Sequence, residues 1–212
     1  MATRASNPDP AGRPHGPDAA APAAGTLAAT SGLAGSLLLA MQQTGSEDDG
    51  FRNSVVYICD HDADGALGFV INRASTLSFG ALCREIGFDP PADPDRPVLS
   101  GGPVSRERGF ILHDDETWGD AVPAGSGTYL SMTQDSLLSL AAGRGPARCL
   151  ILLGYAGWGP GQLDQELLGN FWLTCPADRE LLFDLPLDDR QHGAAARLGF
   201  DYRQLSAHAG HA

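Results

Sequence analysis

The chain has 212 residues, of which 42% are hydrophobic and 7% aromatic, enough for one domain with a substantial core. All 14 basic residues are arginine, and the absence of lysine excludes chemistry that needs a Schiff-base or phosphate-loop lysine. The formal net charge of −12 disfavours direct nucleic-acid binding, which needs a positive surface. We expect a small molecule or a protein as partner, and leave the oligomeric state open.

The first 30 residues are mostly Ala, Pro, Gly, Ser and Thr. Such a segment cannot bury enough apolar surface to offset the entropy lost on ordering. We therefore expect a disordered tail over residues 1–30 and a single domain over residues 36–212.

The sequence favours a cytoplasmic location. The apolar run at 33–41 resembles the core of a signal peptide, but the stretch before it contains acids and prolines instead of a basic segment. No apolar run approaches the ~20 residues of a membrane span. Four widely spaced cysteines, each in or beside an apolar run, are typical of buried thiols in a reducing compartment. They are Cys59, Cys83, Cys149 and Cys175.

Short strands dominate the first half of the domain. Apolar or β-branched runs predict strands over residues 36–41, 54–59, 66–72, 98–99 and 109–113. An Asp-Gly pair at Asp64 and Gly65 predicts a hairpin turn between the second and third strands. Residues 78–87 are expected to form a helix that Ser78 caps and Gly87 ends, with Phe79, Leu82 and Ile86 on one face.

The second half alternates strands and helices. A strand over 128–132 leads to Thr133, which is expected to cap a helix that runs through Ala142 and stops at Gly143. The most apolar strand, 147–153, runs into a glycine-rich loop at 154–161 and a helix over 162–172. A last helix is expected over 188–198. Antiparallel hairpins with inserted helices indicate an α+β fold with a mostly antiparallel sheet.

The loop at 60–65 (DHDADG) starts like a calcium-binding loop. However, Ile71 stands where an EF-hand needs a bidentate glutamate, and the flanking segments are strands. We interpret the loop as a solvated hairpin turn, and expect no metal site and no cofactor.

Cys59 and His61 are two residues apart on a predicted strand. On a continuous strand this spacing places both side chains on one face, where they would form a thiolate and base or half of a zinc site. The alternative is a buried thiol next to a surface imidazole.

The segment from 147 to 172 is the strongest candidate for a ligand site. Gly157 and its neighbouring glycines let a backbone approach a ligand closely, and the amides at the start of the next helix can hold an anion. Tyr155 and Trp158 offer stacking faces, and Gln162 and Glu166 project from the helix. The pattern is neither a Walker A loop nor a complete G-x-G-x-x-G. The alternative, a tight crossover with Trp158 in the core, is favoured.

A second glycine-rich turn contains Gly101 and Gly102, followed by Arg106 and Arg108. An arginine there can meet a carboxylate or phosphate of a ligand. A surface ion pair with one of the 26 acids is the more common outcome.

Several of these segments together resemble the YqgE/AlgH family of bacterial proteins. The matching motifs are SVVYICDH at 54–61, GALGFVIN at 65–72, GGPVSRERGFILH at 101–113, residues 133–135, LGYAGWGPGQ at 153–162 with Glu166, and AGHA at 209–212. Asn72, which closes the second motif, joins the candidate ligand-binding residues. The sequence departs from the family pattern in a longer loop at 42–50 and in Gln134, where the family often has arginine.

The resemblance implies an α+β fold whose sheet forms a partial barrel with helices packed outside. It also implies a cytosolic bacterial protein, and a link to transcriptional control of alginate synthesis. From all of this we expect a regulatory protein that binds a small molecule or protein near residues 154–166. A thiol-based redox or enzymatic role of Cys59 and His61 is the second hypothesis. A transcriptional regulator is the third, with direct DNA binding disfavoured by the net charge.

Overall fold

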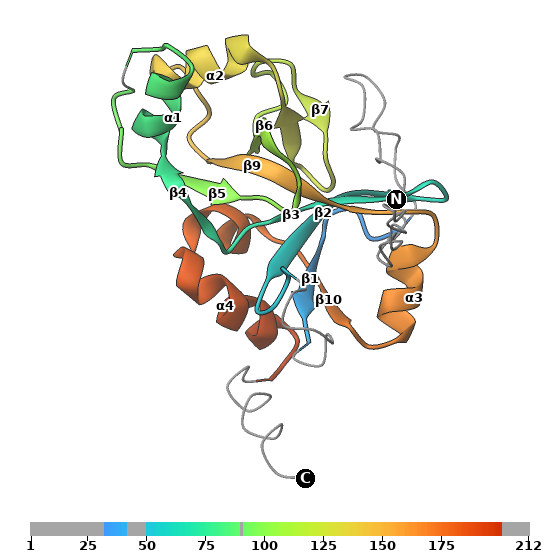
Figure 1. Ribbon diagram of the computed structural model, residues 1–212. Coiled ribbons are helices and arrows are strands. Elements are labelled where there is room, and N and C mark those ends of the chain that lie inside the picture. Colours follow the sequence, from blue (N-terminus) through green and yellow to red (C-terminus); the bar gives the residue numbers. More distant parts are fainter. Residues whose placement is uncertain (1–31, 42–49, 90, 201–212) are drawn as a thin grey trace, which may run out of the picture.

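The computed structural model describes residues 32–41, 50–89 and 91–200 (Figure 1). The tail predicted to be disordered, residues 1–30, lies outside these ranges, as do the closing motif and nearly all of the loop at 42–50. Within the described part of the chain, no helix is long and apolar enough to cross a membrane.

The strands form one curled, mostly antiparallel sheet. They are β1 (Ser36–Ala40), β2 (Val55–Asp62), β3 (Gly65–Val70), β4 (Ala74–Ser78), β5 (Pro97–Ser100), β6 (Val104–His113), β7 (Val122–Pro123), β8 (Tyr129–Ser131), β9 (Cys149–Trp158) and β10 (Trp172–Pro176). Their order is β10-β1-β2-β3-β9-β6-β8-β7, with β4 paired to β5 and β5 parallel to β9. The expected α+β fold with a partial barrel is confirmed.

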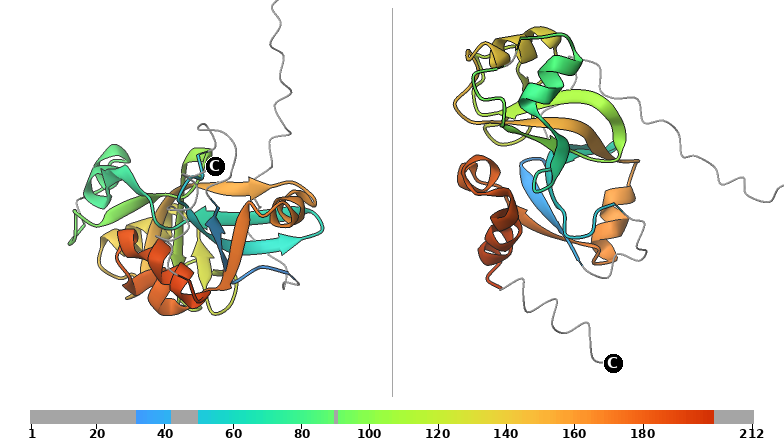
Figure 2. Two further views of the ribbon diagram at one scale, coloured as in Figure 1. Left: turned by 90° about the horizontal axis from the view of Figure 1, so that it is seen from below. Right: turned by 60° about the vertical axis from the view of Figure 1, so that its left-hand side comes forward.

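The helices lie outside this sheet. They are α1 (Phe79–Glu85), α2 (Gln134–Ala141), α3 (Gln162–Leu168), the π-helical segment η1 (Glu180–Asp184), the 3-10 turn η2 (Leu187–Asp189) and α4 (Arg190–Arg197). Helices α1 and α2 sit together at one end, while α3 and α4 lie on two sides of the other (Figures 1 and 2). Both predicted caps are confirmed, because Ser78 accepts from Ala81 N and Thr133 accepts from Ser136 N.

Alternating side chains of the central strands fill separate cores. In β2, Tyr57 packs in the main core, while Val56 and Ile58 pack in a second core on the other face of the sheet. The Tyr57 hydroxyl donates to the Ala124 carbonyl at 2.8 Å, which satisfies its polar end. A third core lies beneath α1 and α2, while α3 packs on the second core and α4 on the main core.

Strand β9 is longer than the sequence predicted, because residues 154–158 of the expected loop continue the strand. Its first part pairs with β5 and β6, and its end pairs with β3. The glycines of the turn at 101–102 allow this turn to lie directly against the backbone of β9. A Cβ on Gly101 would lie 2.4 Å from the Gly154 carbonyl oxygen, and one on Gly102 would lie 2.2 Å from that of Tyr155. These glycines permit close backbone packing.

The expected helix over 162–172 was too long. Helix α3 ends at Leu168, with Gly169 at its C-cap, and Trp172 opens strand β10, where it pairs with Ala40 of β1. Strands β4, β7 and β10 and the segment η1 were not predicted from sequence. Each is short or lies at an edge, where local periodicity carries little signal.

Two glycines of the β5–β6 region provide a matched test of this packing. We expect Gly101→Ala to lower the free energy of unfolding by about 3 kcal/mol, because its methyl group would collide with the Gly154 carbonyl. Gly109→Ala should raise it by about 0.5 kcal/mol, since Gly109 has an ordinary φ and a Cβ there would meet nothing within 4 Å. Urea unfolding followed by circular dichroism measures both. Equal effects of the two substitutions would contradict the close approach at Gly101.

Candidate functional site

Cys59 and His61 do not share a face of β2. The strand pairs Ile58 with Gly68 and then Asp60 with Leu67, so Cys59 is an extra residue in a β-bulge. The extra residue reverses the alternation of side chains that follow it. Cys59 lies in the main core, whereas His61 is paired with Ala66, which packs against the second core. The expectation of one face is wrong for this reason.

His61 instead connects two peripheral segments. Its Nδ1 accepts from the backbone N–H of Leu33 at 3.4 Å, and its Nε2 lies 3.6 Å from a carboxylate oxygen of Asp164 in α3. Burial raises the pKa of the Cys59 thiol above its ordinary value, and the nearby Asp60 raises it further. The thiolate needed for nucleophilic chemistry is therefore disfavoured at neutral pH.

Trp158, Gln162 and Glu166 do come together, at the end of β9 and the start of α3. One Glu166 carboxylate oxygen accepts from the Trp158 indole at 2.9 Å and from the Trp172 indole at 2.7 Å. The other oxygen accepts from Gln162 at 2.9 Å. Trp172 and Phe51 were not identified from the sequence as members of this cluster. The Phe51 ring packs against the indoles of Trp158 and Trp172. A single carboxylate thus ties α3 to two strands.

This cluster is closed to a stacking ligand. Trp158 is only 6% exposed and Tyr155 only 2%, and the Tyr155 ring packs edge-on against Phe110 in the main core. Gly157 pairs with Leu67 inside the sheet, and the Gly159 amide donates to Gln162. The expectation that Tyr155 and Trp158 present stacking faces is therefore wrong, and the alternative with Trp158 in the core holds.

The remaining predicted residues lie elsewhere. Asn72 accepts from Val55 N at 2.9 Å and donates to the Asn53 carbonyl at 2.8 Å, so it fastens the segment before β2. The Arg108 guanidinium lies 5.4 Å from the centre of the Phe110 ring. The turn at 101–102 has a packing role. Asn72, Arg108 and this turn therefore do not join the Trp158–Glu166 cluster in one site.

A cavity of about 320 Å³ lies between α1, α2 and the strands β6 and β9. We call it the apolar pocket. Its lining is hydrophobic apart from two polar side chains, and it consists of Leu82, Ile86, Glu107, Gly109, Phe110, Ile111, Met132, Gln134, Leu137, Ile151 and Leu153. Ile86 is 41% exposed, although it was expected on the same helix face as the buried Phe79 and Leu82. Its position on the pocket lining accounts for this exposure.

Gly109 stands in the middle of β6, where it pairs with Leu153. Unlike Gly101, Gly102 and Gly154, it has open space around the position of a Cβ, and its φ is not in the left-handed region. Neither a turn nor close packing requires glycine here. A glycine within a strand lowers strand stability and often marks the approach of a ligand. Sequence reasoning placed Gly109 in a strand but gave no reason to single it out.

A second cavity, of about 360 Å³, lies on the opposite side of the sheet region formed by β5 and β9. We call it the arginine pocket, after Arg96 and Arg190, which line it together with Cys149 and several apolar side chains. Its parts come from residues 96–99, 149–150 and 183–190, so no local motif could reveal it. Within the described ranges, no three His, Cys, Asp or Glu side chains are grouped to hold a metal ion.

Comparisons of the sequence and of the structure with known proteins point to the same family. The model of the AlgH-like family (DUF179) matches residues 37–203. A UPF0301 protein of Xanthomonas campestris is 45% identical over 183 residues, which cover 85% of this chain and 96% of the relative. A UPF0301 protein of Rhizobium rhizogenes is 44% identical over 189 residues, covering 85% and 93% respectively.

Two solved structures share the fold. The solution structure of the AlgH protein of Pseudomonas aeruginosa has a TM-score of 0.71 and 41% identity, and the match covers 88% of this chain and all of that one. A crystal structure of a Corynebacterium diphtheriae protein has a TM-score of 0.60 at 19% identity, covering 77% and 86%. The second likeness concerns the fold alone.

The reactivity of Cys59 follows from its burial. Because its pKa is raised, the thiolate fraction at pH 8 is smaller than for a free thiol, whose pKa is ~8.5. We expect iodoacetamide to leave Cys59 of the native protein unmodified up to pH 9 and to modify all four cysteines in urea. Peptide mass spectrometry measures the labelling site by site. A native-state labelling midpoint at Cys59 below pH 8 would contradict the buried position.

Glu166 should matter for stability. Both carboxylate oxygens of Glu166 accept hydrogen bonds from N–H groups. In Glu166→Gln an NH2 group replaces one of these oxygens, so a donor then faces a donor. We expect the free energy of unfolding to fall by about 2 kcal/mol, measured by urea unfolding with tryptophan fluorescence. The control Gln165→Ala, on an exposed position of the same helix, should change it by less than about 0.5 kcal/mol. If the free energy of unfolding of Glu166→Gln equals that of the wild type, the hydrogen bonds to the Glu166 carboxylate do not stabilise the fold.

Proposed function

The chain belongs to the AlgH-like family, and within it we propose a non-catalytic role: the protein binds a small, mainly apolar molecule in the apolar pocket and acts as a regulator. The observation that carries this proposal is the unfilled space above Gly109, in the middle of a strand that lines the pocket. A binding protein that does not transform its ligand acts through the conformations that the ligand stabilises. A cytoplasmic location, supported by the four free buried cysteines, is part of the proposal.

The lining of the apolar pocket suggests the shape of the ligand. Leucine and isoleucine side chains from α1, α2, β6 and β9 surround its body, and Met132 adds a side chain that adapts easily to different shapes. Glu107 and Gln134 are the polar groups of the lining. Pockets of this kind bind by burying apolar surface and orient the ligand through a few polar contacts. An uncharged molecule with an apolar ring or chain and one polar group fits this description.

Two other hypotheses receive less support. A redox or enzymatic role for Cys59 with His61 is disfavoured by the bulge that places the two side chains on different faces. Direct DNA binding is disfavoured by the net charge of −12, since contacts to phosphates depend on a positive surface. Regulation through a bound small molecule needs neither a reactive thiol nor a basic surface.

Filling the space above Gly109 tests the proposal. The probe is N-phenyl-1-naphthylamine, a neutral apolar molecule whose fluorescence rises on leaving water. We expect saturable binding to the wild type and at least tenfold weaker binding to Gly109→Leu, because the new side chain occupies the pocket. Gly109→Ala is the matched control and should bind the probe nearly as strongly as the wild type, because it adds only a methyl group to open space.

Folding of both variants is checked by circular dichroism and urea unfolding, so a loss of binding is separated from a loss of structure. Absence of saturable binding to the wild type, or equal binding to the wild type and Gly109→Leu, would refute the proposal.

A further inference from the structure

The arginine pocket contains a buried positive charge that has no acidic partner among the residues that the structure describes. Arg190, the first residue of α4, is only 3% exposed. Its Nε donates to the Leu185 carbonyl at 3.1 Å and its Nη1 to the Ile71 carbonyl at 2.5 Å. Within the described ranges it makes no ion pair with a carboxylate. Burial lowers its pKa to about 10, which reflects the cost of keeping this charge away from water.

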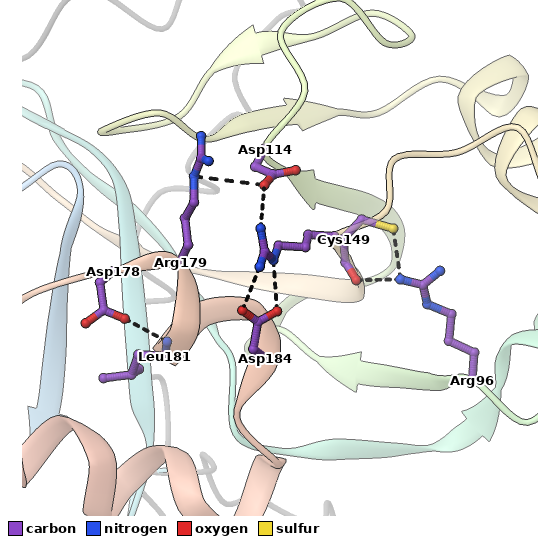
Figure 3. Close-up of polar contacts among 8 residues, drawn as sticks. Arg96, Asp114, Cys149, Asp178, Arg179, Leu181 and Asp184 are labelled. Carbon is purple, nitrogen blue, oxygen red and sulfur yellow. Dashed lines mark hydrogen bonds and ion pairs between the residues drawn. The ribbon is translucent and has the colours of Figure 1, made fainter.

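Arg96 brings a second cation to the same cavity. Its Nη2 donates to the Cys149 carbonyl at 2.7 Å and to the Cys149 sulfur at 3.0 Å (Figure 3). These contacts fix the guanidinium at the start of β9. In the part of the chain that the structure describes, Arg96 also has no ion pair with an acid.

Two neighbouring arginines, Arg148 and Arg179, do have acidic partners. Arg148 makes a two-pronged contact with Asp184, at 2.9 and 3.0 Å, and lies 3.9 Å from Asp114. Arg179 also approaches Asp114 at 3.9 Å, and Figure 3 shows this paired group beside Arg96 and Cys149. The chain has 26 acids for 14 arginines. Two arginines that line one cavity and have no carboxylate partner in the described ranges therefore need another explanation.

A buried charge without a counter-ion is costly unless an opposite charge or several hydrogen bonds compensate it. Two carbonyls satisfy two donors of Arg190 but supply no full negative charge. The rest of the lining is apolar, with Leu99, Leu150, Phe183 and Leu187 as its main side chains. The cavity thus combines two cations with a hydrophobic wall.

We propose that the arginine pocket binds a small organic anion: its oxyanion, a carboxylate or a phosphate, lies between Arg96 and Arg190, and its apolar body packs on Leu99, Phe183 and Leu187. Guanidinium groups match the geometry of both oxyanions through paired hydrogen bonds. The volume of about 360 Å³ limits the ligand to a small metabolite. This site is separate from the apolar pocket, so neither proposal depends on the other.

Four probes distinguish the possible ligand chemistries: phenylacetate, phenyl phosphate, neutral phenylacetamide and inorganic phosphate. Binding to the full chain is measured by calorimetry at low salt, in a buffer whose only anion is chloride. We expect phenylacetate or phenyl phosphate to bind, and the tighter of the two identifies the oxyanion. Phenylacetamide should bind at least tenfold more weakly, because it lacks the charge, and added salt should weaken the anions.

Three arginine variants test the residues. Arg96→Gln should weaken anion binding at least tenfold, and Arg190→Met, which keeps the apolar stem, should do the same. The midpoint of urea unfolding of Arg190→Met should fall, because the Leu185 and Ile71 carbonyls lose their donors, so binding is compared only after the variant is shown to be folded. Arg148→Gln is the matched control, since this arginine already has acidic partners and does not line the cavity; its anion binding should equal that of the wild type.

Several results would overturn the proposal. They are no binding of either organic anion at millimolar concentration, binding of phenylacetamide as tight as that of phenylacetate, inorganic phosphate binding as tightly as phenyl phosphate, or equal weakening by Arg148→Gln and Arg96→Gln. If Arg190→Met fails to fold, Arg96→Gln still decides the outcome. Gly109→Leu should bind the anions like the wild type, which separates this site from the apolar pocket.

Discussion

The arrangement of this domain depends on the close contact between strand β9 and the turn at Gly101 and Gly102. Strand β9 pairs with β5 and β6 in its first part and with β3 at its end, so it joins the two halves of the sheet. The turn lies directly on its backbone at Gly154 and Tyr155, where no larger residue fits. Neighbouring residues of β9 then serve different cavities: Leu150 lines the arginine pocket and Ile151 the apolar pocket. One strand thus positions both candidate sites, on its two faces.

Much of the fold was predictable because its signals are local. The caps at Ser78 and Thr133 and the hairpin before Gly65 all follow from side chains within a few residues. The continuation of β9 through Gly154 was missed for a physical reason. Glycine is used both in turns and where two backbones approach closely, and the second use depends on a segment 50 residues earlier. Sequence periodicity contains no information about that contact.

In the candidate sites, too, local arrangements were predictable from the sequence and tertiary contacts were not. The sequence brought Trp158 and Glu166 together correctly, because they flank one strand–helix junction, but their burial could not be read from spacing. A bulge separates Cys59 from His61, and a single extra residue leaves no mark in the pattern of apolar side chains. Arg190 was missed because its environment is tertiary: it donates to the carbonyl of Ile71, 119 residues earlier. Burial without an acid partner becomes visible only in three dimensions.

The carboxylate of Glu166 has one further consequence, which is optical. Two of the three tryptophans of the chain, Trp158 and Trp172, donate to the same oxygen and stand edge-on with ring centres 6.0 Å apart. Such a pair is expected to couple electronically and to dominate the near-ultraviolet dichroism. The third, Trp118, packs against the core beneath α1 and α2, some of whose residues also line the apolar pocket. The protein therefore carries natural chromophores at the α3 junction and at the core beneath α1 and α2, and we expect near-ultraviolet dichroism to respond to changes at both places.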